Sequence, residues 1–263
     1  MKFKKGLISS ILFMGQISDA SAALMRDDIN VQVYRDYAEN RGVFFPGAVN
    51  VPVYHIDGSM SGTLNVIPDF SSNADGGFST LISAQVAPSA VHVGYTDNLT
   101  FGKRFQQLDA TLFSGAEKAE SYTLMNEVTK RAYDVETTDD YKITRLRTLV
   151  TDAAPSELFT DTSQIKQGLV IARVGGGTFA VALDKNTIQD LGYGPMAGGT
   201  NIIETVSLNG QVYNLRITLT EAQKTALDVG TLGGDSGVWG WDTKSQSWKL
   251  GAINSAGGGT KVY

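Results

Sequence analysis

The chain has 263 residues and a mass of 28.2 kDa, which is enough to bury a sizeable core without disulfide bonds. Its net charge of −5, its pI near 5.1 and the lack of a basic stripe interleaved with aromatic residues exclude a nucleic-acid partner. The 29 glycines and the scarcity of long helical periodicities favour strands over helical bundles, so the sequence predicts an all-β protein.

Residues 1–22 have the features of a secretory signal peptide. Three lysines stand among the first five residues, the apolar run at 6–17 is too short to span a bilayer, and small residues occupy 20–22. Cleavage after this motif would make Ala23 the first mature residue. Export usually permits disulfide bonds, but the chain has no cysteine, so we expect its stability to come from the core alone.

The first half of the mature chain is predicted to combine one short helix with strands. The helix is expected between the acidic pair at 27–28 and Gly42, which would stop it. A hairpin is predicted from residues 51–56 and 63–67, which flank an Asp-Gly turn, and a further strand at 79–83.

The chain has two histidines, and they differ in their suitability as a general base. His55 ends a predicted strand just before a turn and has no partner motif nearby, so we predict a structural role. His92 follows Pro88, which is expected to break its strand, and would therefore lie at a strand end or in a loop. His92 is the better candidate.

The second half is predicted to be a further set of strands joined by polar segments. The predicted elements are a strand after Ser121, an acidic pair at 139–140 before a strand at 146–150, a polar connection at 151–168, a hairpin of 169–174 and 178–183 around glycines 175–177, a strand at 211–219 and a capped helix at 220–227. The acidic pair could equally be an ordinary surface loop.

The stretch 231–240 places Ser236 between glycines and behind an aspartate. Glycines allow a tight turn that can aim the backbone amides of Gly234 and Ser236 at one point, as an oxyanion hole requires. Such a serine also needs a histidine base and an orienting carboxylate. The same residues could form a plain surface turn, or an aspartic protease motif, for which the sequence lacks the second Asp-Ser-Gly or Asp-Thr-Gly.

Taken together, these segments resemble the protease domain of the serine protease autotransporters, the immunoglobulin A protease-like family of Gram-negative bacteria. The resemblance runs through most of the mature chain, in the family's order. The matching segments are ALMRDD at 23–28, YRDYAENRG at 34–42, FPGA at 45–48, PDFS at 68–71, the His92 segment with FG at 101–102, DY at 140–141 before RL at 145–146, LVT at 149–151, and the Ser236 turn.

The resemblance implies a chymotrypsin-like double β-barrel, with a first barrel at 23–150, a connection at 151–168 and a second barrel at 169–263. It implies a triad of His92 as general base, Asp140 as its orienting carboxylate and Ser236 as nucleophile. Asp140 is chosen over its neighbour because the family's aspartate directly precedes an aromatic residue. The implied substrate-binding positions are Gly230, at the base of the primary pocket, and Ser255 and Gly257.

Two features depart from the family pattern. Val238 and Trp239 follow the nucleophile motif where the family usually has Ser-Pro, and only 27 residues follow Ser236 (263 − 236), with neither β-helix repeats nor the alternating strands of a membrane barrel. We therefore expect the second barrel to be incomplete. We also expect outer-membrane translocation to use a barrel domain not present in this chain.

The sequence thus predicts a secreted serine endopeptidase that cleaves host or extracellular proteins through an acyl-enzyme. It is expected to be exported through the periplasm to the cell surface or beyond, and to need neither cofactor nor metal, because the two histidines lack metal-ligand spacing. Two alternatives remain: a non-catalytic passenger domain that acts as an adhesin or binding module, and a truncated, inactive fragment.

Overall fold

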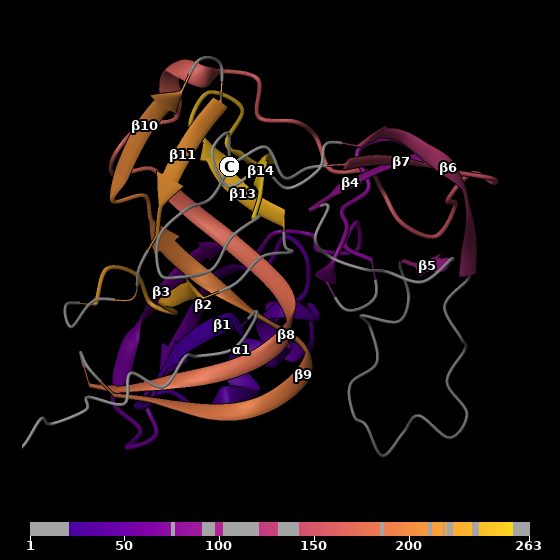
Figure 1. Ribbon diagram of the computed structural model, residues 1–263. Helices are drawn as coiled ribbons and strands as arrows, with labels where there is room; N and C mark the ends of the chain where they lie inside the picture. Colours follow the sequence, from indigo (N-terminus) through magenta and orange to yellow (C-terminus); the bar gives the residue numbers. More distant parts are fainter. Residues whose placement is uncertain are drawn as a thin grey trace, which may run out of the picture.

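The structure is a computed structural model in which strands dominate (Figure 1), as the sequence predicts. It describes residues 21–74, 77–90, 98–101, 121–130, 142–184, 187–209, 212–217, 219, 223–232 and 237–254.

The largest sheet has six strands in the order β12-β1-β8-β13-β14, with β9 also paired to β8. Its strands are β1 (Ser21–Arg26), β8 (Val170–Asp184), β9 (Thr187–Ile202), β12 (Val229–Leu232), β13 (Gly237–Asp242) and β14 (Ser247–Ile253). The N-terminal strand β1 runs parallel to β8 and antiparallel to β12. Residues 21–26 therefore lie in the same sheet as the strands that flank Ser236.

A second sheet of four strands lies to one side of the first (Figure 1) and has the order β4-β7-β6-β5. It comprises β4 (Val86–Ser89), β5 (Asn98–Thr100), β6 (Ser121–Lys130) and β7 (Lys142–Leu146). The strand predicted after Ser121 is confirmed as β6.

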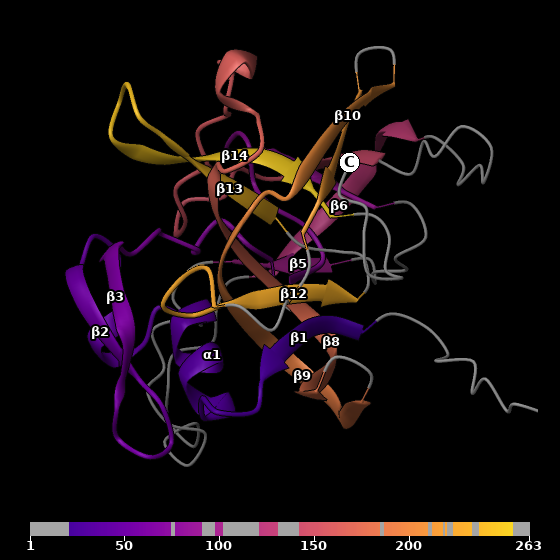
Figure 2. The same cartoon turned by 90° about the vertical axis from the view of Figure 1, so that its left-hand side faces the viewer.

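Two hairpins and a helix complete the described fold. They are β2 (Val49–Tyr54) with β3 (Met60–Val66), β10 (Thr205–Asn209) with β11 (Val212–Arg216), and α1 (Val31–Ala38); 3-10 turns occur at Gly42–Phe44 and Thr162–Gln164. The predicted helix and first hairpin are confirmed. Asn30 caps α1 through the backbone amide of Gln32, and Tyr34 and Tyr37 bury its inner face. The long β8–β9 hairpin curves past this helix (Figures 1 and 2).

The hairpin predicted around glycines 175–177 is wrong, because β8 runs unbroken through them and turns back only after Asp184. These glycines do not form a turn; they allow another segment of backbone to approach β8 closely. A Cβ built on Gly77 would lie 2.5 Å from the backbone nitrogen of Gly176, so the 77 loop rests directly on this part of β8. A register shift between Gly175 and Gly177 marks a bulge at the same place.

The prediction that Pro88 breaks a strand is also wrong. Pro88 lies within β4, opposite Ile143 of β7, whereas the strand predicted at 79–83 reduces to two isolated bridges, Asn73 with Thr80 and Ser83 with Val86. Proline has no backbone N–H group to donate. Because β4 is an edge strand, this missing donor on its outer side costs no hydrogen bond of the sheet.

The helix predicted at 220–227 is not formed by its described residues, 223–227. Instead the buried carboxylate of Asp228 accepts hydrogen bonds from the backbone amides of Lys224 and Thr225, each at 2.7 Å. A side chain that satisfies two backbone donors in this way stabilises a turn at the expense of the helix.

Trp239 of β13 is the largest fully buried side chain of the described residues and joins the two halves of the chain. Its ring meets Phe70 edge-on at 5.1 Å between centroids, and its Nε1 donates to the Ser156 hydroxyl, which lies 2.7 Å from that of Ser72. The Val-Trp pair that departs from the family pattern is therefore core, since Val238 is buried as well.

We predict that Gly237→Ala lowers the free energy of unfolding by about 1–3 kcal/mol. The added Cβ would lie 2.5 Å from the Trp239 ring and 2.9 Å from Thr80 Oγ1, so packed groups must shift. Gly251→Ala on the paired strand β14 is the matched control, because its nearest neighbour would be 3.7 Å away. Urea unfolding of both variants measures the difference; equal stabilities would contradict this packing argument.

Candidate active site

The predicted triad residues His92, Asp140 and Ser236 lie outside the described residues. The same holds for the oxyanion residue Gly234 and for the substrate-binding positions Ser255 and Gly257, and of the predicted site only Gly230 is described. The structure does describe the strands that flank His92, Asp140 and Ser236 in sequence, and the strand that leads to Ser255.

In the four-stranded sheet, β4 and β7 are antiparallel and Ser89 is the register partner of Lys142. Ser89 stands three residues before His92, and Lys142 stands two residues after Asp140. The described chain therefore leaves β4 toward the histidine, and enters β7 from the aspartate, at one end of the same strand pair.

In the six-stranded sheet, β12 ends at Leu232 and β13 begins at Gly237, on either side of residues 233–236. Gly237 is the register partner of Ile253 on β14. The fully buried Asn254 follows, directly before Ser255. The described strands thus bring Gly237, directly after Ser236, opposite Ile253, which lies two residues before Ser255.

Gly230 lies on β12 opposite Leu24 of β1. A Cβ at this position would lie 2.9 Å from the backbone nitrogen of Leu219, so the backbone approaches closely enough to require glycine. On its other side, Nη1 of the fully buried Arg173 donates to the Gly230 carbonyl at 3.4 Å. Sequence reasoning missed Arg173, although an arginine inside the apolar run 169–174 is a usable signal.

Asp228 is the acidic side chain nearest to Gly230 in sequence, and its carboxylate accepts hydrogen bonds from within the protein. Besides the two amides described above, it accepts from the Thr225 hydroxyl. The residue is only 1% exposed and its carboxylate accepts three internal hydrogen bonds, so this carboxylate is not available to bind a substrate cation.

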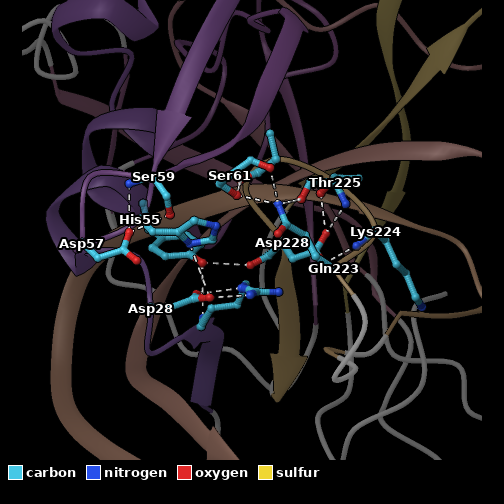
Figure 3. Close-up of polar contacts among 12 residues, drawn as sticks. Asp28, His55, Asp57, Ser59, Ser61, Gln223, Lys224, Thr225 and Asp228 are labelled. Atoms are coloured by element: carbon cyan, nitrogen blue, oxygen red, sulfur yellow. Dashed lines mark hydrogen bonds and ion pairs between the residues drawn. The ribbon is translucent and has the colours of Figure 1, made fainter.

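A polar network connects this turn to the N-terminal segment (Figure 3). The hydroxyl of the buried Tyr34 donates to the backbone carbonyl of Asp228 at 3.1 Å and accepts from the backbone amide of Arg26. Burial raises the pKa of Tyr34, so its phenol stays protonated and keeps its donor at physiological pH. The end of β1 is therefore tied to the start of β12.

His55 belongs to the same network, where it contacts Asp28 (Figure 3). Its Nδ1 lies 3.4 Å from the Asp28 carboxylate, and Arg26 Nε donates to that carboxylate at 2.8 Å. The hydrogen bond from Arg26 lowers the pKa of Asp28, so this contact adds stability at neutral pH and loses it as the pH falls through the lowered pKa. These contacts are those of the structural histidine that the sequence predicts.

Metal ligands do not gather in the described ranges, where no group of three or more His, Asp or Glu side chains could hold an ion. The helices described here are also too short or too polar to cross a membrane.

Comparison with known proteins identifies the family. The family model described as Immunoglobulin A1 protease matches residues 22–263. The Adhesion and penetration protein autotransporter of Haemophilus influenzae is 27% identical over 97% of this chain and 19% of its own length. Serine protease EatA of Escherichia coli O78:H11 is 29% identical over 90% of this chain and 17% of its own length.

Two solved structures show the same fold. The Haemophilus influenzae Hap adhesin matches with a TM-score of 0.69 at 23% identity, over 91% of this chain and 27% of that one. The passenger domain of Plasmid encoded toxin from enteroaggregative Escherichia coli matches with a TM-score of 0.54 at 20% identity, over 89% and 25% of the two chains. These likenesses confirm the all-β fold.

The chain spans less than a fifth of the length of the curated relatives named here. Those relatives include autotransporters, which confirms the predicted export through the periplasm to the cell surface or beyond it. The match over residues 22–263 shows that this protein belongs to the Immunoglobulin A1 protease family of autotransporter passenger domains.

Proposed function

We propose that the chain is the serine endopeptidase domain of an autotransporter, with Ser236 as nucleophile, His92 as general base and Asp140 as the carboxylate that orients the histidine. The observation that carries the proposal is the convergence of described strand ends: β4 and β7 flank the histidine and aspartate positions at one end of a strand pair, and β12 and β13 flank the serine. Family membership and a relative named as a serine protease support it.

The chemistry follows from these roles. Ser236 Oγ attacks the carbonyl carbon of a peptide bond while its proton passes to His92, and the amides of Gly234 and Ser236 stabilise the oxyanion. The C–N bond then breaks as His92 gives the proton to the leaving amine. Water, deprotonated by His92, attacks the acyl-enzyme ester and releases the new carboxylate and the serine. The substrates would be host or extracellular proteins, and translocation of the chain would use an outer-membrane barrel domain.

A second candidate is a binding function without catalysis. It is favoured by the likeness to a structure titled as the Hap adhesin and by the relative named for adhesion and penetration. Labelling of the protein with a fluorophosphonate probe distinguishes the two candidates.

We predict that Ser236 reacts with a fluorophosphonate probe. The protein, secreted from its complete reading frame, should be labelled at Ser236, and Ser236→Ala should abolish labelling, because only an activated serine attacks the probe. Ser245→Ala is the matched control: this exposed serine lies in the turn between β13 and β14, bonds to Asp242, and its loss should leave labelling unchanged. A folded but unlabelled wild type would leave the adhesin function in place of the protease.

Cleavage should show no trypsin-like preference for Arg or Lys before the scissile bond. Gly230 has no side chain to place a charge at the pocket base, and the Asp228 carboxylate already accepts three internal hydrogen bonds. A peptide-library cleavage profile measures the preference, and a profile dominated by basic residues would refute the assignment of Gly230.

Export should remove residues 1–22 and free an amino group at Ala23 that pairs with Asp235. Ala23 is fully buried in β1, directly before Leu24, the register partner of Gly230 on the strand that leads toward Asp235. Intact-mass measurement of the secreted chain gives the cleavage point, and a start beyond Asp28 would rule it out. One residue added before Ala23 should reduce the rate of probe labelling; an unchanged rate would exclude the pairing.

A further inference from the structure

We propose that Thr80 is a positioning residue for the reaction, holding the strand that precedes the base against the strand that follows the nucleophile. This inference rests on the proposed protease function. Thr80 is fully buried between the two sheets. In Figure 1, β4 occupies the side of its sheet nearest to β13, the region in which Thr80 makes its contacts.

One contact of Thr80 is with β4. Its backbone amide donates to the carbonyl of Pro88 at 3.2 Å, and the adjacent Ser79 hydroxyl donates to the same carbonyl at 2.9 Å. Pro88 stands four residues before His92. Thr80 is thereby fixed to the segment that carries the proposed base.

The opposite contact is with β13. A Cβ built on Gly237 would lie 2.9 Å from Thr80 Oγ1, so the hydroxyl rests against the α-carbon of the residue directly after Ser236. The Trp239 ring also lies against this position, 2.5 Å from that Cβ. The Thr80 hydroxyl and the indole ring therefore both pack against the side of Gly237 on which a side chain would stand.

Asn73 fixes the orientation of the Thr80 hydroxyl. Thr80 Oγ1 donates to Asn73 Oδ1 at 2.7 Å, and both residues are fully buried. The Asn73 Nδ2 group has no hydrogen-bond partner among the described residues. A buried amide with an unused donor costs stability, so the Asn73–Thr80 pair is explained better by precise placement of the hydroxyl than by its contribution to stability.

The consequence for catalysis is geometric. Ser236 and its amide immediately precede Gly237, so a shift of Gly237 moves both the nucleophile and an oxyanion donor relative to the base. Displacements of about an ångström cost roughly a hundredfold in rate when reacting groups are held by the protein. Thr80 itself touches no reacting atom.

The test compares Thr80→Val, Thr80→Ser and Ser79→Ala in the secreted protein. Thr80→Val keeps the shape but removes the hydroxyl, and should lower kcat and the fluorophosphonate labelling rate by about tenfold or more while KM changes by less than about twofold. Thr80→Ser retains the hydroxyl and should restore most of the rate. Ser79→Ala removes a buried hydroxyl bonded to the same strand but without the Gly237 contact, and should stay within about twofold of wild type.

Unfolding free energies, measured on all variants, separate positioning from stability. If Thr80→Val loses no more rate than Ser79→Ala, or if Thr80→Ser fails to restore it, the positioning role is wrong. Should Thr80→Val not fold, Asn73→Ala replaces it, because loss of the acceptor frees the hydroxyl and is expected to reduce labelling in the same direction; an unchanged rate overturns the proposal. Failure of wild type to label overturns the protease function, and with it this inference, before any variant is compared.

Discussion

The packing of Trp239, on the strand that follows Ser236 in sequence, is the interaction on which the described architecture depends. Its strand, β13, is the first described element after Ser236, and its ring is covered by Phe70 while its indole nitrogen bonds to Ser156. These partners come from the segment before the four-stranded sheet and from the connection between the two halves. One aromatic side chain thus packs β13 against segments from both halves of the chain.

The N-terminal strand adds a second constraint. β1 lies between β12 and β8, so the sheet that contains β12 and β13 cannot be assembled from the second half of the chain alone. Strands from both sides of residue 150 therefore share one sheet. Tyr34 and Arg26 extend the same coupling, because they link the end of β1 and helix α1 to the backbone of Asp228, where β12 begins. The position of β12 therefore depends on β1 and helix α1.

The sequence was sufficient to predict those elements whose pattern is local and repeated. The capped helix with its buried tyrosines, the first hairpin and the strand after Ser121 all have local signals of this kind. It was insufficient where tertiary contacts determine the local structure. Glycines 175–177 suggest a turn, yet they lie in β8 because the 77 loop needs to approach their backbone. Pro88 suggests a break, yet an edge strand accommodates it.

The same distinction applies to the site. Ser236 and His92 carry recognisable local signals, a glycine turn and a histidine beyond a proline, and Asp140 was selected over Asp139 by family resemblance alone. Thr80 and Asn73 have no such signal, because their importance comes from one contact with Gly237 that joins residues 157 positions apart (237 − 80). In a scaffold that proteases and adhesins share, core packing is sufficient to hold the strands together. Catalysis requires in addition that a few buried polar contacts align the two halves of the chain. In the proposed enzyme the triad residues supply the chemistry, and buried contacts such as that of Thr80 with Gly237 would align the strands that flank them.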